Sequence, residues 1–226
     1  KSRHDTKALI PVLSDFFKKH PLIVPKLFIG DAAFDSSAIY QSLLGELKFE
    51  KAFIPLNQRG KLSYPDCPVN ADGIPCCPND PSLPMKSEGR AKRKNGLVRF
   101  KFTCPKTKWI KQEAGKAKRQ CFCENPCTSS SCGRMCYVYP EKNLRAYPGT
   151  LRGTLEWARI YKIRGVVEQS INHFKDSFCL ANRKTQNART LHADLLLAGI
   201  TQLITAILSD NIHQHQYLRS LKPLVA

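Results

Sequence analysis

Hydrophobic residues recur at helical and strand-like spacing in the first quarter of the chain. A helix is predicted to begin near Asp5, whose carboxylate suits the N-cap position. Its apolar positions, three and four residues apart, are Ala8, Leu9, Val12, Leu13, Phe16 and Phe17. A short buried strand over residues 26–31, a second helix over 36–47 and another strand over 52–56 follow. This alternation with short connections favours an α/β fold with parallel strand pairing.

Helical periodicity returns after residue 150. One apolar stripe is predicted along a helix over residues 160–178, at Ile160, Ile163, Val167, Ile171, Phe174 and Phe178. A second apolar helix is predicted from Thr190 to about Leu208. Three polar residues interrupt this second stretch, namely His192, Asp194 and Gln202. We therefore expect no membrane span and no membrane partner.

The middle of the chain has a different character. Most of the prolines and nine of the ten cysteines lie between residues 57 and 149, with strand-like patches at 98–103 and 135–139. We interpret this segment as a β-rich insertion with long loops. The predicted organisation is a first core part at 1–56, the insertion at 57–149, a second core part at 150–212 and a tail at 213–226.

The charge of the chain favours a polyanionic partner. There are 36 Lys and Arg against 18 Asp and Glu, which gives a net charge of +18 and a pI near 9.6. Between residues 86 and 119 there are thirteen basic and two acidic residues. Lys92, Arg93 and Lys94 in this run are candidate DNA contacts. The alternative is a solvated loop whose charge serves only solubility.

The clustered cysteines leave three interpretations open. Cys123, Cys127, Cys132 and Cys136 follow one another at intervals typical of zinc ligands, so a Zn²⁺ site in the insertion is possible by spacing. No Cys-x2-Cys occurs, however, and reduced thiols or disulfides fit the same composition. Cys179, outside the segment, is expected to be a buried thiol near a helix end.

The most informative polar pattern lies on the predicted helix over residues 160–178. At about 100° per residue, Tyr161, Arg164, Glu168 and Lys175 fall on one stripe about 60° wide, beside the apolar stripe. On an arbitrary helix, Arg164 and Glu168 would simply form an i, i+4 ion pair on the surface.

This spacing, Tyr-x2-Arg-x3-Glu-x6-Lys, resembles the signature of bacterial insertion-sequence transposases with an Asp-Asp-Glu triad. Residues 30–36 resemble the segment around the second catalytic Asp of that family, at a strand end followed by a helix. Residues 54–57 resemble the next strand, and 183–191 with the closing apolar helix resemble the C-terminal block. The resemblance implies an RNase H-like core, a mixed sheet flanked by helices, interrupted by the insertion.

The resemblance also implies a mechanism and partners. Asp31 and Glu168 would be catalytic ligands of Mg²⁺ or Mn²⁺ for phosphodiester cleavage and strand transfer. Arg164 and Lys175 would contact DNA phosphates, and Tyr161 the backbone near the cleavage site. The partners would be transposon ends and target DNA, with a homodimer as the active complex. The location would be the bacterial cytoplasm, at the nucleoid.

One member of the triad has no counterpart in this pattern. The first Asp of the family lies on an early strand, whereas Asp5 and Asp15 fall on the first predicted helix, and Asp35 is expected to cap the second. We therefore expect a C-terminal fragment that lacks the first Asp and is inactive as it stands. Two alternatives stay open: a non-catalytic, zinc-stabilised nucleic-acid-binding module, and an inactive transposase remnant.

Overall fold

The computed structural model describes residues 5–57, 64, 67–92, 98–111, 115, 117–177 and 187–218. The chain is a mixed α/β protein with small sheets. It divides into two compact units, Lys1–Lys162 and Ile163–Ala226. The division into four segments expected from composition stays a prediction.

The first unit begins with a small parallel sheet and its helices. The elements are α1 (Asp5–Lys19), β1 (Leu27–Ile29), the 3₁₀ helix η1 (Ala32–Phe34), α2 (Ser37–Tyr40), the π-helix η2 (Gln41–Glu46) and β2 (Lys51–Phe53). Strands β1 and β2 pair in parallel, with Phe28 opposite Ala52. The helices, the strands and their parallel pairing confirm the prediction from hydrophobic periodicity.

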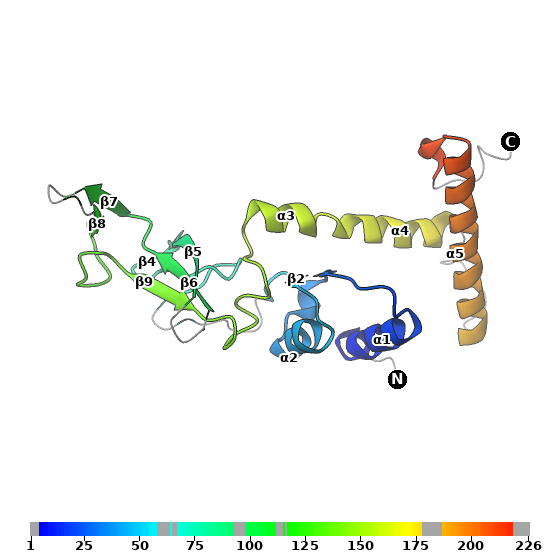
Figure 1. Cartoon of the computed structure of the whole chain (residues 1–226), viewed down its shortest axis with the longest axis horizontal. Helices are drawn as coiled ribbons and strands as arrows, with labels where there is room; N and C mark the ends of the chain where they lie inside the picture. The colour runs from blue at the N-terminus through cyan, green and yellow to red at the C-terminus, as the bar shows by residue number, and fades with distance from the viewer. Residues whose placement is uncertain are drawn as a thin grey trace. The chain divides into compact units, whose positions relative to one another are not determined.

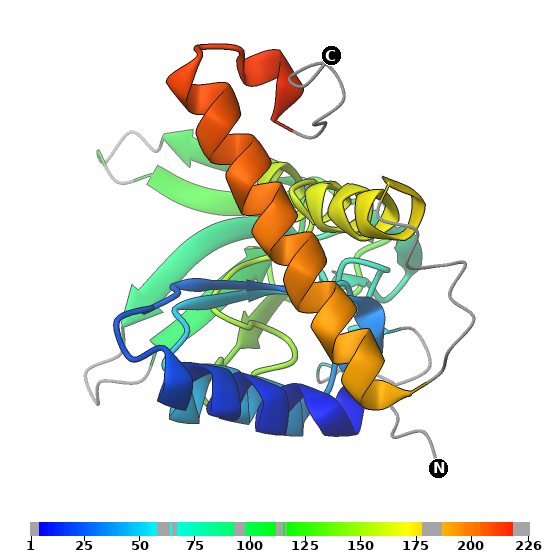
Figure 2. The same ribbon diagram turned by 90° about the vertical axis from the view of Figure 1, so that its right-hand side faces the viewer.

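Helices α1 and α2 lie on one side of the β1–β2 pair (Figures 1 and 2). A buried cluster joins them, formed by Ile39, Tyr40, Leu43, Phe49, Ala52 and Ile54. Leu9, Leu13 and Phe17 of α1 pack against it, which are the same positions that the periodicity places on the apolar face. This core fixes the carboxyl end of β1, where Gly30 and Asp31 follow.

The cysteine-rich segment, residues 57–149, forms strands and turns in the first unit. Its strands are β3 (Cys76–Cys77), β4 (Asp80–Pro84), β5 (Lys86–Lys92), β6 (Val98–Thr103), β7 (Thr107–Lys111), β8 (Ala117–Cys121) and β9 (Met135–Val138). They pair as β3–β4, β5–β6–β9 and β7–β8, all antiparallel. The strands expected at 98–103 and 135–139 are confirmed. The sequence pattern missed the others because they are short or mainly polar.

A second hydrophobic core lies beneath the three-stranded sheet of this segment. It contains Tyr64, Cys67, Met85, Phe100, Phe102, Cys136, Val138 and Ala146. Alternate residues of β6 and β9 contribute to this core, namely Phe100, Phe102, Cys136 and Val138, all of which are buried. The segment therefore carries an apolar core of its own, despite its high charge.

The helix expected over residues 160–178 is interrupted. Helix α3 (Leu155–Tyr161) closes the first unit, Lys162 and Ile163 form a turn, and α4 (Arg164–Ser177) opens the second. Gly165, a weak helix former, directly follows the break. Tyr161 and Arg164 thus lie on different helices, and helical periodicity no longer fixes their relative position.

The second unit consists of α4, α5 (Ala188–Asn211) and the 3₁₀ helix η4 (His215–Tyr217) among the residues described. The expected helix from Thr190 is confirmed. Within this unit the apolar side chains of α4 and α5 are largely left uncovered: Val167 is 57% exposed and Leu203 63%. His173 on α4 and Gln202 on α5 form a hydrogen bond of 2.9 Å.

Helix α5 also bears on the expected absence of a membrane span. By length and composition, it is the one helix in the described ranges that could cross a membrane. A core helix of a water-soluble protein meets the same criterion, and α5 contains His192, Asp194 and Gln202. Its composition therefore does not by itself establish a membrane-spanning role.

Candidate active site

Asp31 lies at the carboxyl end of the parallel strand β1, where the sequence analysis places a catalytic carboxylate. It is the N-cap of η1, and its Oδ1 accepts a hydrogen bond of 2.6 Å from the Ala32 backbone N–H. The residue is exposed to solvent. The hydrogen bond from the Ala32 N–H fixes the orientation of this exposed carboxylate. Its oxygens are ligands of the kind that hard cations prefer.

Gly30 lets the chain pack tightly just before Asp31. A Cβ atom added at Gly30 would lie 2.7 Å from an atom of the Phe28 ring and 3.2 Å from the Phe34 ring. The two rings meet edge to face with centroids 6.5 Å apart. Any larger residue would push these rings apart and move the backbone that carries Asp31.

Asp35 has a different role from the helix cap expected of it. The cap of α2 is Ser36, whose Oγ accepts a hydrogen bond from the Ile39 N–H. The Asp35 carboxylate is instead buried: Oδ1 accepts from the Tyr40 hydroxyl at 2.8 Å, and Oδ2 accepts from the Asn57 N–H at 2.8 Å. The expectation was wrong because the side chain turns inward, toward arginines distant in the sequence.

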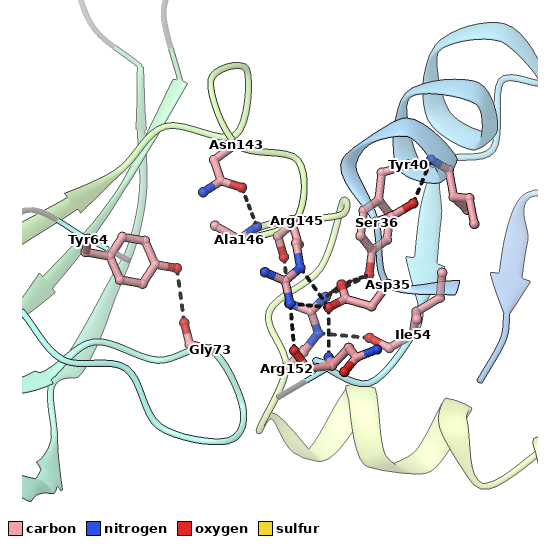
Figure 3. A network of polar contacts seen from close by, with 12 residues as sticks. Asp35, Ser36, Tyr40, Ile54, Tyr64, Gly73, Asn143, Arg145, Ala146 and Arg152 are labelled. Carbon is pink, nitrogen blue, oxygen red and sulfur yellow. Dashed lines mark hydrogen bonds and ion pairs between the residues drawn. The ribbon is translucent and has the colours of Figure 1, made fainter. Parts of the chain in front are cut away.

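Two arginines complete this buried cluster (Figure 3). Arg145 contacts Asp35 Oδ2 at 2.8 Å and donates to the Asn57 carbonyl at 2.8 Å. Arg152 contacts Asp35 Oδ1 at 3.4 Å and donates to the Tyr40 hydroxyl at 2.8 Å and the Ile54 carbonyl at 2.9 Å. Burial raises the pKa of Tyr40 well above its usual range, so this hydroxyl stays protonated.

The cluster ties both ends of the cysteine-rich segment to the small parallel sheet. Asn57 begins the segment, Arg145 lies near its end and Arg152 just beyond it; the two arginines are 110 and 117 residues from Asp35. Sequence reasoning missed Arg145, Arg152 and Tyr40. In the sequence, Arg145 and Arg152 lie close to residue 150, where helical periodicity resumes. That position alone does not distinguish them from the other basic residues of the chain.

The signature residues of α4 stay together on one face of that helix. Arg164 Nη1 and Glu168 Oε1 are 2.9 Å apart in an i, i+4 ion pair, with side chains 34% and 56% exposed. Lys175, which is also exposed, lies about two helical turns after Glu168 on the same face of the helix. Tyr161, at the end of α3, stacks on Trp157 with ring centroids 4.7 Å apart.

Asp31 and Glu168 belong to different units of the chain, so their convergence on a shared metal ion stays a prediction. Their chemistry fits a divalent cation, because both are exposed carboxylates with hard oxygen donors. Across the described residues, no three His, Cys, Asp or Glu side chains form a group that could hold a metal ion.

The four cysteines proposed for zinc are not brought together. Cys127 instead lies beside Cys77, Cys136 beside Cys67, and Cys121 beside Cys104. The Cys123 thiol donates to the Asn125 carbonyl at 3.3 Å. Cys136, on β9, lies in the hydrophobic core, where burial raises its pKa to about 12. Zinc binding by the four cysteines stays a prediction.

The basic residues chosen as DNA contacts are largely beyond what the structure describes. Lys92 ends β5, and Arg93 and Lys94 lie outside the described residues, as does Cys179. Their role stays a prediction.

Comparison with known proteins supplies one match. A family model described as "Transposase DDE domain" matches residues 1–204, which include the first unit with its cysteine-rich segment and part of the second unit. Neither a curated protein nor a solved structure matches the chain. The family model covers most of the chain and both signature regions, so the chain belongs to the transposase DDE domain family.

Proposed function

We propose that this chain forms the catalytic domain of a DNA transposase, for metal-dependent phosphodiester cleavage and strand transfer. The observation that carries the proposal is Asp31, an exposed carboxylate at the carboxyl end of a parallel strand, in a chain of the transposase DDE domain family. In this proposal the α/β part is an RNase H-like core, and the cysteine-rich segment is an insertion into it. The setting is the bacterial cytoplasm, at the nucleoid.

Asp31 and Glu168 are proposed to hold Mg²⁺ or Mn²⁺. Such ions, when bound, polarise the phosphodiester and stabilise the oxygens that attack and leave. The chain itself orients the ligands: the Ala32 N–H fixes one oxygen of Asp31, and Arg164 holds Glu168. A cation beside a metal-binding carboxylate is the arrangement needed to receive a phosphate at the same place.

DNA contacts are proposed for Tyr161, Arg164 and Lys175, and for the basic run at Lys92, Arg93 and Lys94. Cations aimed at phosphates set the position of a strand without reading its sequence. The α4 residues in this set are Arg164 and Lys175, on the same stripe as Glu168. A homodimer is proposed for the active complex.

The first aspartate of the triad has no candidate on the strands of residues 5–57. Asp15 is on α1 and pairs with Lys19, and Asp35 is buried against two arginines. We therefore propose that these 226 residues alone are inactive and that cleavage requires a third carboxylate on another segment.

The test is nicking of supercoiled plasmid in Mg²⁺ by the full-length product of the gene. Glu168→Gln and Asp31→Asn should each abolish nicking while leaving DNA binding nearly intact, because they remove metal ligands. Glu46→Gln, which also neutralises an exposed glutamate, is the control and should nick like the parent. Mn²⁺ binding, followed by electron paramagnetic resonance, should weaken in the first two variants alone.

A second candidate function is a non-catalytic nucleic-acid-binding module. The observation that favours it is the concentration of thirteen basic residues between 86 and 119. Equal nicking by the parent and Glu168→Gln, or none by either with tight DNA binding retained, would support this candidate over the enzyme.

A further inference from the structure

The hairpin formed by β7 and β8 has two faces of opposite character. The strands pair antiparallel over five residues each, from Thr107 opposite Cys121 to Lys111 opposite Ala117. Successive side chains of a strand point to opposite faces. One face therefore carries Trp109 and Arg119, with Lys111 and Ala117 at the end of the strands, and the other carries Lys108, Ile110, Lys118 and Gln120.

The face with Trp109 and Arg119 is anchored to the neighbouring three-stranded sheet. The Arg119 guanidinium lies over the Trp109 ring, 4.9 Å from its centroid, and forms an ion pair with Glu88 of β5. Glu88 also pairs with Lys101 of β6 at 2.9 Å. Arg119 is only 5% exposed, so this contact holds the hairpin through a nearly buried ion pair.

The opposite face, which we call the ribbon face, is open to solvent. All four of its residues, Lys108, Ile110, Lys118 and Gln120, are exposed. Lys108 lies directly opposite Gln120, and Ile110 opposite Lys118. In the part of the chain that is described, neither lysine forms an ion pair with a carboxylate.

We propose that the ribbon face is a docking surface for duplex DNA, with Lys108 and Lys118 against phosphates. This inference rests on the proposed function, from which it takes DNA as the partner, and adds the surface that binds it.

The shape and the chemistry of the ribbon face both fit this partner. A two-stranded β-ribbon is narrow enough to enter the major groove of B-form DNA. The two lysines lie on different strands and at diagonal positions, so they can face phosphates on either side of a groove. Gln120 and Ile110 between them supply an amide and an aliphatic group, which are suited to an adenine edge and a thymine methyl.

The anchoring of the other face supports this assignment. A hairpin held to the neighbouring sheet through the Arg119–Glu88 ion pair presents its outer lysines from a fixed strand geometry. Less conformational freedom is then lost on binding than for lysines of a loop. The lysines are also free of acidic neighbours on their own face, so no carboxylate of the hairpin strands has to be displaced by a phosphate.

The experiment measures binding of a fluorescent 30-base-pair duplex by anisotropy, across a series of salt concentrations. The double variant K108A/K118A should lower the slope of log affinity against log salt by about 1.8, since each phosphate contact contributes about 0.9. The charge-matched control K18A/K142A removes two exposed lysines elsewhere in the same unit and should leave the slope close to the parent. An unchanged slope in K108A/K118A, or an equal decrease in both double variants, would overturn the proposal.

Lysine acetylation gives a second readout on the unaltered protein. Bound duplex should protect Lys108 and Lys118 from an amine-acetylating reagent, and should leave Lys18 as reactive as before. Equal reactivity of all three with and without DNA would overturn the ribbon face while leaving the proposed function standing. Absence of salt-dependent duplex binding by the parent would count against both. Equal circular dichroism of all variants confirms that the exposed substitutions leave the fold intact.

Discussion

The first unit buries its arginine–carboxylate cluster, whereas the second unit leaves the Arg164–Glu168 pair exposed. Asp35 has a fully buried side chain and contacts Arg145, Arg152 and Tyr40, all within the protein. The side chain of Glu168 is 56% exposed, and it forms an ion pair with Arg164, one helical turn away. Pairs of similar geometry therefore have different consequences: desolvation makes the first essential to folding, and solvent leaves the second available to a ligand.

The surroundings of the two pairs explain the difference. Asp35 lies beside a core that contains Tyr40, Leu43 and Ile54, so a water molecule cannot replace a lost partner easily. Within the second unit, by contrast, α4 and α5 leave many apolar and polar side chains uncovered. A charge on α4 can exchange its partner for water or for a phosphate at small cost.

Removing the buried carboxylate should produce the largest effect. Asp35→Ala leaves two largely buried guanidinium groups without their anion, and we expect a loss of about 3–5 kcal/mol in the free energy of unfolding. Urea unfolding followed by tryptophan fluorescence measures it. Asp15→Ala is the matched control, because it breaks an exposed pair with Lys19 and should change stability by less than about 0.5 kcal/mol. Similar losses in both variants would show that burial does not distinguish these pairs.

The backbone before Asp31 offers the next largest effect. Gly30→Ala places a methyl group 2.7 Å from the Phe28 ring and should cost about 1–3 kcal/mol through overpacking. Gly45→Ala, in η2, meets nothing within 4 Å and should be neutral or slightly stabilising. Thermal unfolding of the two variants compares a packed glycine with an open one. A neutral Gly30→Ala would mean that the two phenylalanine rings adjust freely.

Cys136 should make stability depend on alkaline pH. Burial, with Cys67 beside it, raises the pKa of the folded thiol to about 12, whereas an unfolded cysteine titrates near 8.5. Because the folded protein favours the protonated thiol, its full stability is present below about pH 8.5. This contribution to stability is lost as the pH rises toward 12, since the unfolded chain then loses the proton more readily. We expect about 1–2 kcal/mol to be lost between pH 8 and 10 from this group.

The pH effect is measured by urea unfolding in a reductant at several pH values, with Cys136→Ala as the comparison. The variant lacks the titrating thiol, so the stability difference between it and the parent should shrink as pH rises. A difference that stays constant from pH 8 to 10 would contradict the assignment to Cys136.

The sequence predicted what short-range patterns determine. Periodicity located α1, β1, β2 and α5, and alternation located β6 and β9, because each places apolar side chains on one face of a local element. It failed where partners are distant in sequence. Asp35 looks like a helix cap in the sequence, because its ion pairs with Arg145 and Arg152 join residues more than 100 positions apart.

The candidate site was predicted in the same uneven way. Asp31 after a strand and an Arg164–Glu168 ion pair both follow from local sequence, and both are present. The catalytic role of Asp31 and Glu168 stays a prediction. The turn at Lys162 and Ile163 was not predicted, since the apolar stripe continues through it without a proline or a helix cap. A break of this kind depends on how the two units fold rather than on residue order alone.

The smallest effect on stability should come from Glu168→Gln. Loss of an exposed i, i+4 ion pair costs about 0.3–0.5 kcal/mol, so urea unfolding should hardly distinguish the variant from the parent. Its effect on Mn²⁺ binding should be large, because an amide replaces a charged oxygen ligand. Arg164→Ala removes the same ion pair from the other side and should leave metal binding intact while weakening DNA binding. Equal metal binding by the parent and Glu168→Gln would show that Glu168 is not a metal ligand. The Arg164–Glu168 pair would then be an ordinary surface ion pair, and its exposure would have no functional meaning.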